Sequence, residues 1–265
     1  MKTYGANTIT TTMTNLWRNP MLNEQTFEIL YSLKLHGMAQ ALQEQLKHPD
    51  ITELCFDERF ALLVDRQWSW KENKRLERLL GNAKLKINGC IEDIDYKKHR
   101  GVDKSVILSL AGCEWITQAQ NIIITGPTGV GKTYLACALA NCACRNGHTA
   151  LYVRCPRLFQ HLAIARGDGS YTKLMHKLSK TKVLILDDLG LAPLTDAERR
   201  DMLEVLEDRY DLSSTIVTSQ VPTDLWHDCI GDPTIADAIL DRLIHNSHKI
   251  TLKGGSMRKQ LPKKS

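Results

Sequence analysis

The stretch Gly126–Thr133, GPTGVGKT, contains residues whose types and spacing suit phosphate binding. It matches the pattern G-x-x-x-x-G-K-[ST], which arises by chance in roughly one chain in a hundred of this length. Its glycines allow the backbone to curl so that successive amides point at one phosphate group, and the following helix adds partial positive charge. Lys132 is placed to bridge the outer phosphates and Thr133 to bind Mg²⁺. We therefore predict an ATP site formed by Gly126, Pro127, Thr128, Gly129, Val130, Gly131, Lys132 and Thr133.

A second motif, KVLILDDLG, places two carboxylates directly after four apolar residues. Such a run suits a buried strand, and ligands of parallel sheets bind at the carboxyl ends of strands. We expect Asp187 to contribute to the Mg²⁺ site, and Asp188 to orient and deprotonate an attacking water. The alternative is structural, because acids at strand ends also cap helices.

Two further residues complete the expected chemistry of phosphate hydrolysis. One expected strand, TALYVR, lies in the sequence between the lysine and the double aspartate. An additional strand between the strand of the phosphate loop and the strand that carries the acid is a feature in which the chain resembles AAA+ ATPases, helicases and recombinases. In that branch the next strand ends in a polar sensor, here Gln220, which alternatively only begins a turn. Arg242 is the candidate arginine finger for a neighbouring subunit, or else a surface ion-pair partner. Arg209 is the second candidate, ahead of Arg199 and Arg200.

The elements around these motifs change in character along the chain. Residues 1–22 predict a flexible lead, 23–88 a small all-helical N-terminal domain, and 89–120 a linker with the first helix of the core. In the N-terminal domain we expect one helix from about Asp57 to Gln67 and another that starts at a capping box formed by Ser69 and Glu72. Residues 121–253 alternate five apolar strands with helices, which predicts an α/β P-loop core with a five-stranded parallel sheet covered on both faces. Residues 254–265 form a short basic tail, so a C-terminal lid is absent or vestigial.

Composition limits the range of functions. The chain has 265 residues, 43% hydrophobic content and eight cysteines without a C-x-x-C pair. This favours a folded protein with buried thiols and no cysteine metal site. The sequence shows no membrane-length apolar run and no secretory signal, so we expect a cytoplasmic protein that does not act on membranes.

The formal net charge of +5 is concentrated in two stretches. From Arg66 to Lys86 there are seven basic and two acidic residues, and from Arg242 to the end seven basic and none acidic. Solvated surfaces and phosphate contacts are both compatible with this pattern. Trp68 and Trp70 either stack on bases or, as we favour, pack the helical domain. The candidate DNA contacts, without base specificity, are Lys71, Lys74, Arg75, Arg78, Lys84, Lys86, Lys97, Lys98 and Arg100.

The sequence resembles the IstB family of transposition helper ATPases, which is related to the helicase loader DnaC. The resemblance rests on LKLHGMAQALQEQL, CIEDIDYKKHRGVDKSVILSLAGCEWI, the phosphate motif, VLILDDLGLAPL, TIVTSQVPTDLWHDCIGDPTIADAILDRLIHNS and LKGGSMRK. It implies an AAA+ core, ATP-dependent homo-oligomerisation as a ring or filament on double-stranded DNA, and stimulation of an IstA-like transposase at the chosen target. Arg258 is the only candidate for a second sensor arginine.

Two other functions remain open at this point. One is a DnaC-like helicase loader, which the related core favours. The other is a nucleotide-gated DNA scaffold in which hydrolysis is incidental.

Overall fold

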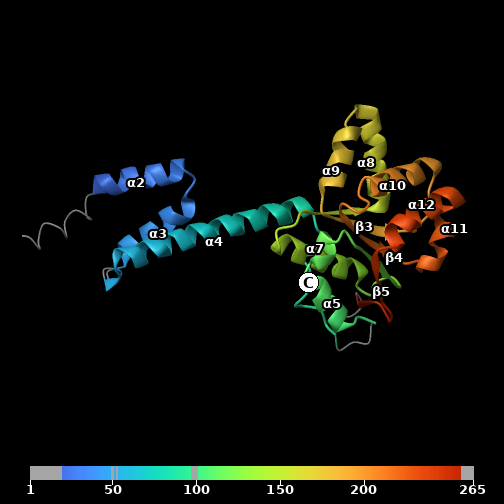
Figure 1. The fold of residues 1–265 in the computed structure, drawn as a ribbon, viewed down its shortest axis with the longest axis horizontal. Coiled ribbons are helices and arrows are strands. Elements are labelled where there is room, and N and C mark those ends of the chain that lie inside the picture. Colours follow the sequence, from blue (N-terminus) through green and yellow to red (C-terminus); the bar gives the residue numbers. More distant parts are fainter. Residues whose placement is uncertain (1–19, 49–50, 52, 97–100, 258–265) are drawn as a thin grey trace, which may run out of the picture. The chain divides into compact units, whose positions relative to one another are not determined.

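The computed structural model describes residues 20–48, 51, 53–96 and 101–257. It divides into two compact units, residues 1–75 and 76–265 (Figure 1). The division falls within one helix, earlier than the expected domain boundary at residue 88. The last turns of this helix belong to the second unit, because Leu79 and Ala83 are buried in its core.

The first unit contains α2 (Pro20–Ser32), α3 (His36–Lys47) and most of α4 (Phe56–Ala83). Gly37 allows α3 to approach α4 closely, since a Cβ at this position would lie 2.7 Å from the Gln67 Cα atom. The Gln67 side chain accepts a hydrogen bond of 3.1 Å from the Met38 amide. This close backbone approach joins the two helices.

The prediction of separate helices on either side of Ser69 is wrong, because α4 continues through this residue. A capping box starts a helix only where the preceding residues leave helical geometry. Between Gln67 and Lys71 the sequence has neither proline nor glycine to break the helix. The result is one helix of 28 residues.

The second unit is built on a five-stranded sheet in the order β2-β3-β4-β1-β5, with every neighbouring pair parallel. The bounds are β1 (Asn121–Thr125), β2 (Ala150–Arg154), β3 (Val183–Leu189), β4 (Ser214–Ser219) and β5 (Ser247–Thr251). This confirms the predicted parallel sheet. The strand that separates β1 from β3 in space is β4, whereas β2, the strand between the two motifs in sequence, lies at the edge.

Helices cover both faces of this sheet (Figure 1). Ile122 and Ile124 of β1 pack into one core cluster and Ile123 into the other, because successive strand residues point to opposite faces. The first face holds α5 (Lys104–Ala111), α6 (Glu114–Thr117) and α7 (Lys132–Arg145). The second holds α8 (Cys155–Asp168), α9 (Tyr171–Lys180), α10 (Asp196–Glu207), α11 (Trp226–Ile230) and α12 (Pro233–Ile244), with the short turn η3 (Thr223–Leu225) before α11.

Side chains cap the starts of two helices of this unit. Thr195 and Glu198 form a capping box at the start of α10, and the Asp232 side chain accepts from the Ile235 amide at the start of α12. After β5 the described chain continues only through Leu252–Met257 and contains no helical lid. Arg258 lies outside the described residues. Among the described helices, none is both long enough and apolar enough to cross a membrane.

Candidate functional site

The phosphate motif forms the loop between β1 and α7, as its sequence predicts. Gly126, Gly129 and Gly131 have φ values of 143°, 80° and 107°, in the region where residues with a Cβ are strained. Lys132 is only 6% exposed, and its ammonium donates to the carbonyls of Gly126 at 2.6 Å and Pro127 at 2.9 Å. The loop therefore folds around its own lysine, whose charge lies within the curve of the backbone.

Asp187, at the carboxyl end of β3, lies next to this loop and is fully buried. Its Oδ1 atom accepts hydrogen bonds from Thr133 Oγ1 at 2.9 Å and from Thr218 Oγ1 at 2.6 Å. Its Oδ2 atom accepts from the Tyr152 hydroxyl at 2.6 Å, with Lys86 Nζ 4.0 Å away. The structure thus brings together Thr133 and Asp187, the two residues that the sequence predicts as Mg²⁺ ligands.

These oxygens fit the requirements of Mg²⁺. The ion prefers hard oxygen ligands and is usually held by one or two carboxylates together with phosphate oxygens and waters. Here a threonine hydroxyl and a buried carboxylate face each other at 2.9 Å beside the phosphate loop. Thr133 and Asp187 would hold the ion, directly or through water.

Asp188 points away from this network. It has a φ of 64°, unusual for a residue with a side chain, and its amide donates to Thr218 Oγ1 at 3.1 Å. Its carboxylate accepts a hydrogen bond of 2.9 Å from Arg154 Nε at the end of β2. The two carboxylates therefore have different partners, although both residues contact Thr218, and the different roles of Asp187 and Asp188 stay predictions.

Thr218, Tyr152 and Arg154 were not identified from the sequence, although Thr218 contacts both aspartates, Tyr152 contacts Asp187 and Arg154 contacts Asp188. They lie on β4 and β2, next to β3 on either side. Partial burial and the hydrogen bond to the Asp187 carboxylate both raise the pKa of Tyr152, whose hydroxyl is a donor at neutral pH. The sequence signal that could have pointed to Thr218 is a polar residue near the carboxyl end of an apolar strand, in the stretch TIVTSQ.

Gln220 follows the last residue of β4 and is exposed. It therefore lies at the same edge of the sheet as the phosphate loop, because the carboxyl ends of all five parallel strands meet there. Its sensor role stays a prediction.

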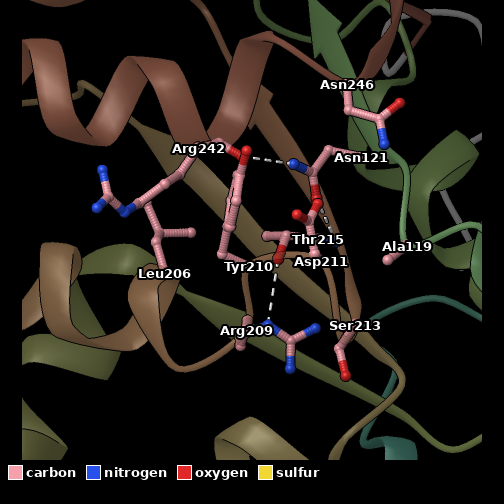
Figure 2. A pocket seen from close by; sticks show the side chains of 10 residues that line it. All are labelled: Ala119, Asn121, Leu206, Arg209, Tyr210, Asp211, Ser213, Thr215, Arg242 and Asn246. Atoms are coloured by element: carbon pink, nitrogen blue, oxygen red, sulfur yellow. Dashed lines mark hydrogen bonds between the residues drawn. The ribbon is translucent and has the colours of Figure 1, made fainter.

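Arg242 lies at the amino edge of the sheet, where Figure 2 shows its backbone hydrogen-bonded to Asn121. Its backbone carbonyl accepts a hydrogen bond of 2.9 Å from Asn121 Nδ2, at the amino end of β1. The phosphate loop begins at the other end of this strand, roughly 13 Å further along at the rise per residue of a β-strand. The guanidinium pairs with Glu207, donates to the Ala238 carbonyl at 2.8 Å, and lies 6.0 Å from the centre of the Tyr210 ring.

Arg209, the second candidate, is buried, and Figure 2 shows its hydrogen bond with Thr215. Its side chain is 1% exposed and donates to Thr215 Oγ1 and to the carbonyls of Leu178, Thr181 and Ser214. Burial lowers the pKa of Arg209 to about 9. This arginine ties the end of α9 to the start of β4.

The lower-ranked arginines differ from each other. Arg199 is bound to the Ile230 carbonyl and to Asp196, whereas Arg200 is exposed.

The predicted DNA contacts fall into three groups. Lys97, Lys98 and Arg100 lie outside the described residues. Lys86 lies 4.0 Å from Asp187, so its nearest described charge is in the nucleotide site. The third group is exposed, with Arg75 paired to Glu72 at 3.3 Å, and consists of Lys71, Lys74, Arg75, Arg78 and Lys84.

The two tryptophans of α4 do not share one role. Trp70 contacts the His36 ring at 4.9 Å and packs within the first unit, as expected. Trp68 is 56% exposed, so the expectation that it packs in a core is wrong.

A basic surface that the sequence reading missed lies on α9. Lys173, His176, Lys177 and Lys180 are exposed at helical spacing i, i+3, i+4 and i+7, and the helix contains no acidic residue. Met175 and Leu178 are buried on its other side. We call these four exposed residues the α9 basic face.

The sheet order, with β4 between β1 and β3, together with the phosphate loop and the aspartates at the end of β3, defines a P-loop protein of the AAA+ class. Comparisons with known proteins agree. The structure resembles the DnaC helicase loader, with a TM-score of 0.53 and 22% identity over 64% of this chain and 100% of that one. It also resembles AMPPCP-bound DnaA from Aquifex aeolicus, with a TM-score of 0.52 and 16% identity over 64% of this chain and 51% of that one.

The sequence comparisons define the family. A sequence model described as IstB-like ATP binding protein matches residues 29–265. The chain is 47% identical to the putative insertion sequence ATP-binding protein y4pL of Sinorhizobium fredii, over 92% of this chain and 100% of the relative. It is 50% identical to the putative ATP-binding protein of insertion sequence IS1162 from Pseudomonas fluorescens, over 77% of this chain and 88% of the relative. The chain belongs to the family of IstB-like ATP-binding proteins.

Proposed function

We propose that this protein is an Mg²⁺-dependent ATPase that assembles on double-stranded DNA and helps a partner transposase insert its element. The observation that carries the nucleotide part is the 2.9 Å contact of Thr133 with Asp187 beside a loop that encloses the Lys132 ammonium. The insertion-sequence names of the relatives support the transposition part. Such a protein acts in the cytoplasm, where bacterial DNA lies.

In the proposed reaction, a water attacks the γ-phosphorus of ATP, the bond to the β–γ bridging oxygen breaks, and ADP leaves. Lys132 and the loop amides hold the phosphates, and Asp188 accepts the proton of the attacking water. Mg²⁺, when bound at Thr133 and Asp187, supplies charge neutralisation to the phosphate oxygens. Asp188 must release Arg154 to act as a base, and the Arg154 side chain, which is 41% exposed, can turn towards solvent when it does so.

The finger role of Arg242 requires a second copy of the chain. The arginine and the phosphate loop lie at opposite edges of one sheet, so one copy cannot bring its own guanidinium to its own nucleotide. A head-to-tail contact solves this by placing Arg242 of one copy at the nucleotide of the next. The ion pair of Arg242 with the exposed Glu207 is a weak restraint, which a more highly charged triphosphate replaces.

Mixing two inactive variants tests this arrangement. Lys132→Ala removes the nucleotide site and Arg242→Ala removes the finger, and each variant alone should have little ATP turnover. In an equimolar mixture, about a quarter of head-to-tail interfaces combine an intact loop with an intact arginine, so turnover should recover to about a quarter of the unmutated protein's. A mixture as inactive as its components, although it assembles normally, would contradict the shared site.

The α9 basic face supports the DNA-binding part of the proposal. Three lysines on one helix face, without neighbouring acids on that helix, suit contacts with successive phosphates. Changing Lys173, Lys177 and Lys180 together to Gln should flatten the salt dependence of duplex binding, with log K against log salt less steep by about 2.7. The matched control changes Lys71, Lys74 and Arg78 of α4 to Gln. An unchanged slope in the α9 variant would exclude this face, and a change in the control alone would favour α4.

A helicase loader is the second candidate function, and the structural likeness to the DnaC helicase loader favours it. Pull-down of the tagged full-length chain with the transposase of its own element, against the replicative helicase of the same host, distinguishes the two. Retention of the transposase alone, dependent on ATP, is the outcome we expect. Retention of the helicase alone would reverse the assignment.

A further inference from the structure

The chain after β5 packs directly against the phosphate loop. The Leu252 amide donates to the Thr125 carbonyl at 2.8 Å, and the Met257 amide donates to the Gly129 carbonyl at 2.9 Å. Between these two bonds Ser256 lies on Gly129, where an added Cβ would be 2.3 Å from the Ser256 hydroxyl and 2.8 Å from its Cβ. Gly129 is therefore both the residue that curls the loop and the residue on which the end of the described chain rests.

This contact fixes the direction of one loop amide. In a trans peptide the carbonyl of one residue and the amide of the next point in opposite directions. Because Met257 holds the Gly129 carbonyl, the Val130 amide must point away from the Leu252–Met257 segment. Val130 is the fifth residue of GPTGVGKT, within the run of amides that such loops turn towards a phosphate.

We propose that Leu252–Met257 is a positioning strap for the phosphate loop, in which Ser256 and the Met257 amide orient the Gly129–Val130 peptide for triphosphate binding. This proposal rests on the nucleotide binding proposed above. It gives the short C-terminal segment a role at the site without a helical lid. The strap acts through the loop backbone. It makes the same contacts with the loop in the ATP-bound ground state and in the transition state.

The attachment of the strap favours reversible docking. Gly254 has a φ of 99°, and a Cβ at Gly254 or Gly255 would meet no atom within 4 Å. These glycines carry a conformational entropy cost, and their own surroundings offer no packing to offset it. The contacts at Gly129 must supply the compensation. Since binding free energies are reciprocal, a strap that favours nucleotide binding is itself held more firmly when nucleotide is bound.

A matched pair of substitutions at residue 257 tests the strap in the full-length chain. Met257→Pro removes the amide donor. Met257→Ala keeps the amide donor, and both variants lose the long methionine side chain, so a difference between them reports on the amide. Losing one hydrogen bond should weaken binding of a fluorescent ATP analogue about fivefold in the proline variant relative to the alanine variant. In steady-state assays KM should rise by a similar factor with kcat unchanged, because the contact is the same in the ground and transition states.

Equal affinities in these two variants would overturn the strap. Lys132→Ala distinguishes this failure from failure of the nucleotide proposal, because it should abolish analogue binding whether or not the strap exists. Hydrogen exchange in the unmutated protein provides a second measurement that needs no folded proline variant. The Met257 amide should exchange more slowly with the ATP analogue than without it, and exchange at the same rate in both conditions would also refute the proposal.

Discussion

Thr218→Val removes a hydroxyl that links both aspartates of the site. Thr218 Oγ1 donates to Asp187 Oδ1 at 2.6 Å and accepts from the Asp188 amide at 3.1 Å. Valine fills the same volume but can do neither, so a buried carboxylate loses a donor and an amide in a strained backbone loses its acceptor. We expect lower stability and lower ATP turnover, since both Asp187 and Asp188 lose a fixed position.

The magnitude follows from these two bonds. A hydrogen bond to a charged group contributes about 1.5–3 kcal/mol, and an unsatisfied buried amide costs about 1–3 kcal/mol. Thr218 is fully buried, so water does not replace either partner. We expect the free energy of unfolding to fall by about 3 kcal/mol, which lowers Tm by about 9 °C for a core of this size.

Thr218→Ser is the matched control, because it keeps the hydroxyl and loses one buried methyl group, worth about 1 kcal/mol. Urea and thermal unfolding of both variants, followed with ATP turnover, separate the hydroxyl from the packing. The serine variant should be the more stable by about 2 kcal/mol and the more active. A valine variant as stable and as active as the serine variant would refute this reading of the Thr218 contacts.

Two further predictions concern residues outside the nucleotide site. Arg209→Lys should lower the free energy of unfolding by about 3 kcal/mol, because one ammonium cannot reach all the acceptors of this buried guanidinium. Arg200→Lys, at an exposed position, is the control, and equal urea midpoints in the two variants would contradict the stabilising role of Arg209. The sulfurs of Cys113 and Cys142 both contact the Ala111 carbonyl, and the neighbouring Cys113 lowers the pKa of Cys142. Since the thiolate is the nucleophile, iodoacetamide labelling of Cys142, read by mass spectrometry, should rise at a lower pH than that of an ordinary thiol, and Cys113→Ala should move its midpoint upward; a midpoint unaffected by that substitution would exclude the thiol pair.

Local patterns were sufficient to predict the centre of the site. The phosphate loop needs two glycines, a lysine and a serine or threonine at fixed positions within eight consecutive residues, so one stretch of sequence is sufficient to predict its chemistry. Asp187 follows a run of apolar residues that predicts its strand and its place at the carboxyl edge. The parallel sheet was predictable for the same reason.

Features that depend on neighbouring strands were not predictable in this way. Thr218 reads as an ordinary β-branched strand residue, and only the placement of β4 beside β3 makes it a partner of Asp187. In the sequence, Arg209 resembles an exposed charged residue. Its burial depends on three backbone carbonyls, those of Leu178, Thr181 and Ser214. Ser69 has the local signature of a helix start, but it lies inside α4, where the residues before it are also helical.

The polarity of the sheet gives the proposed assembly its form. The phosphate loop, Asp187 and Gln220 lie at the carboxyl edge, and Arg242 is tied by its backbone to Asn121 at the amino edge. A contact that joins these two edges uses different surfaces on the two copies, so it is heterologous and leaves one unused edge of each kind on every growing assembly. Such contacts form rings where the rotation closes and filaments where it does not, and each added copy brings another α9 basic face to the DNA. Weak phosphate contacts then add up along the assembly, so the proposed triphosphate at each interface controls DNA affinity without touching DNA.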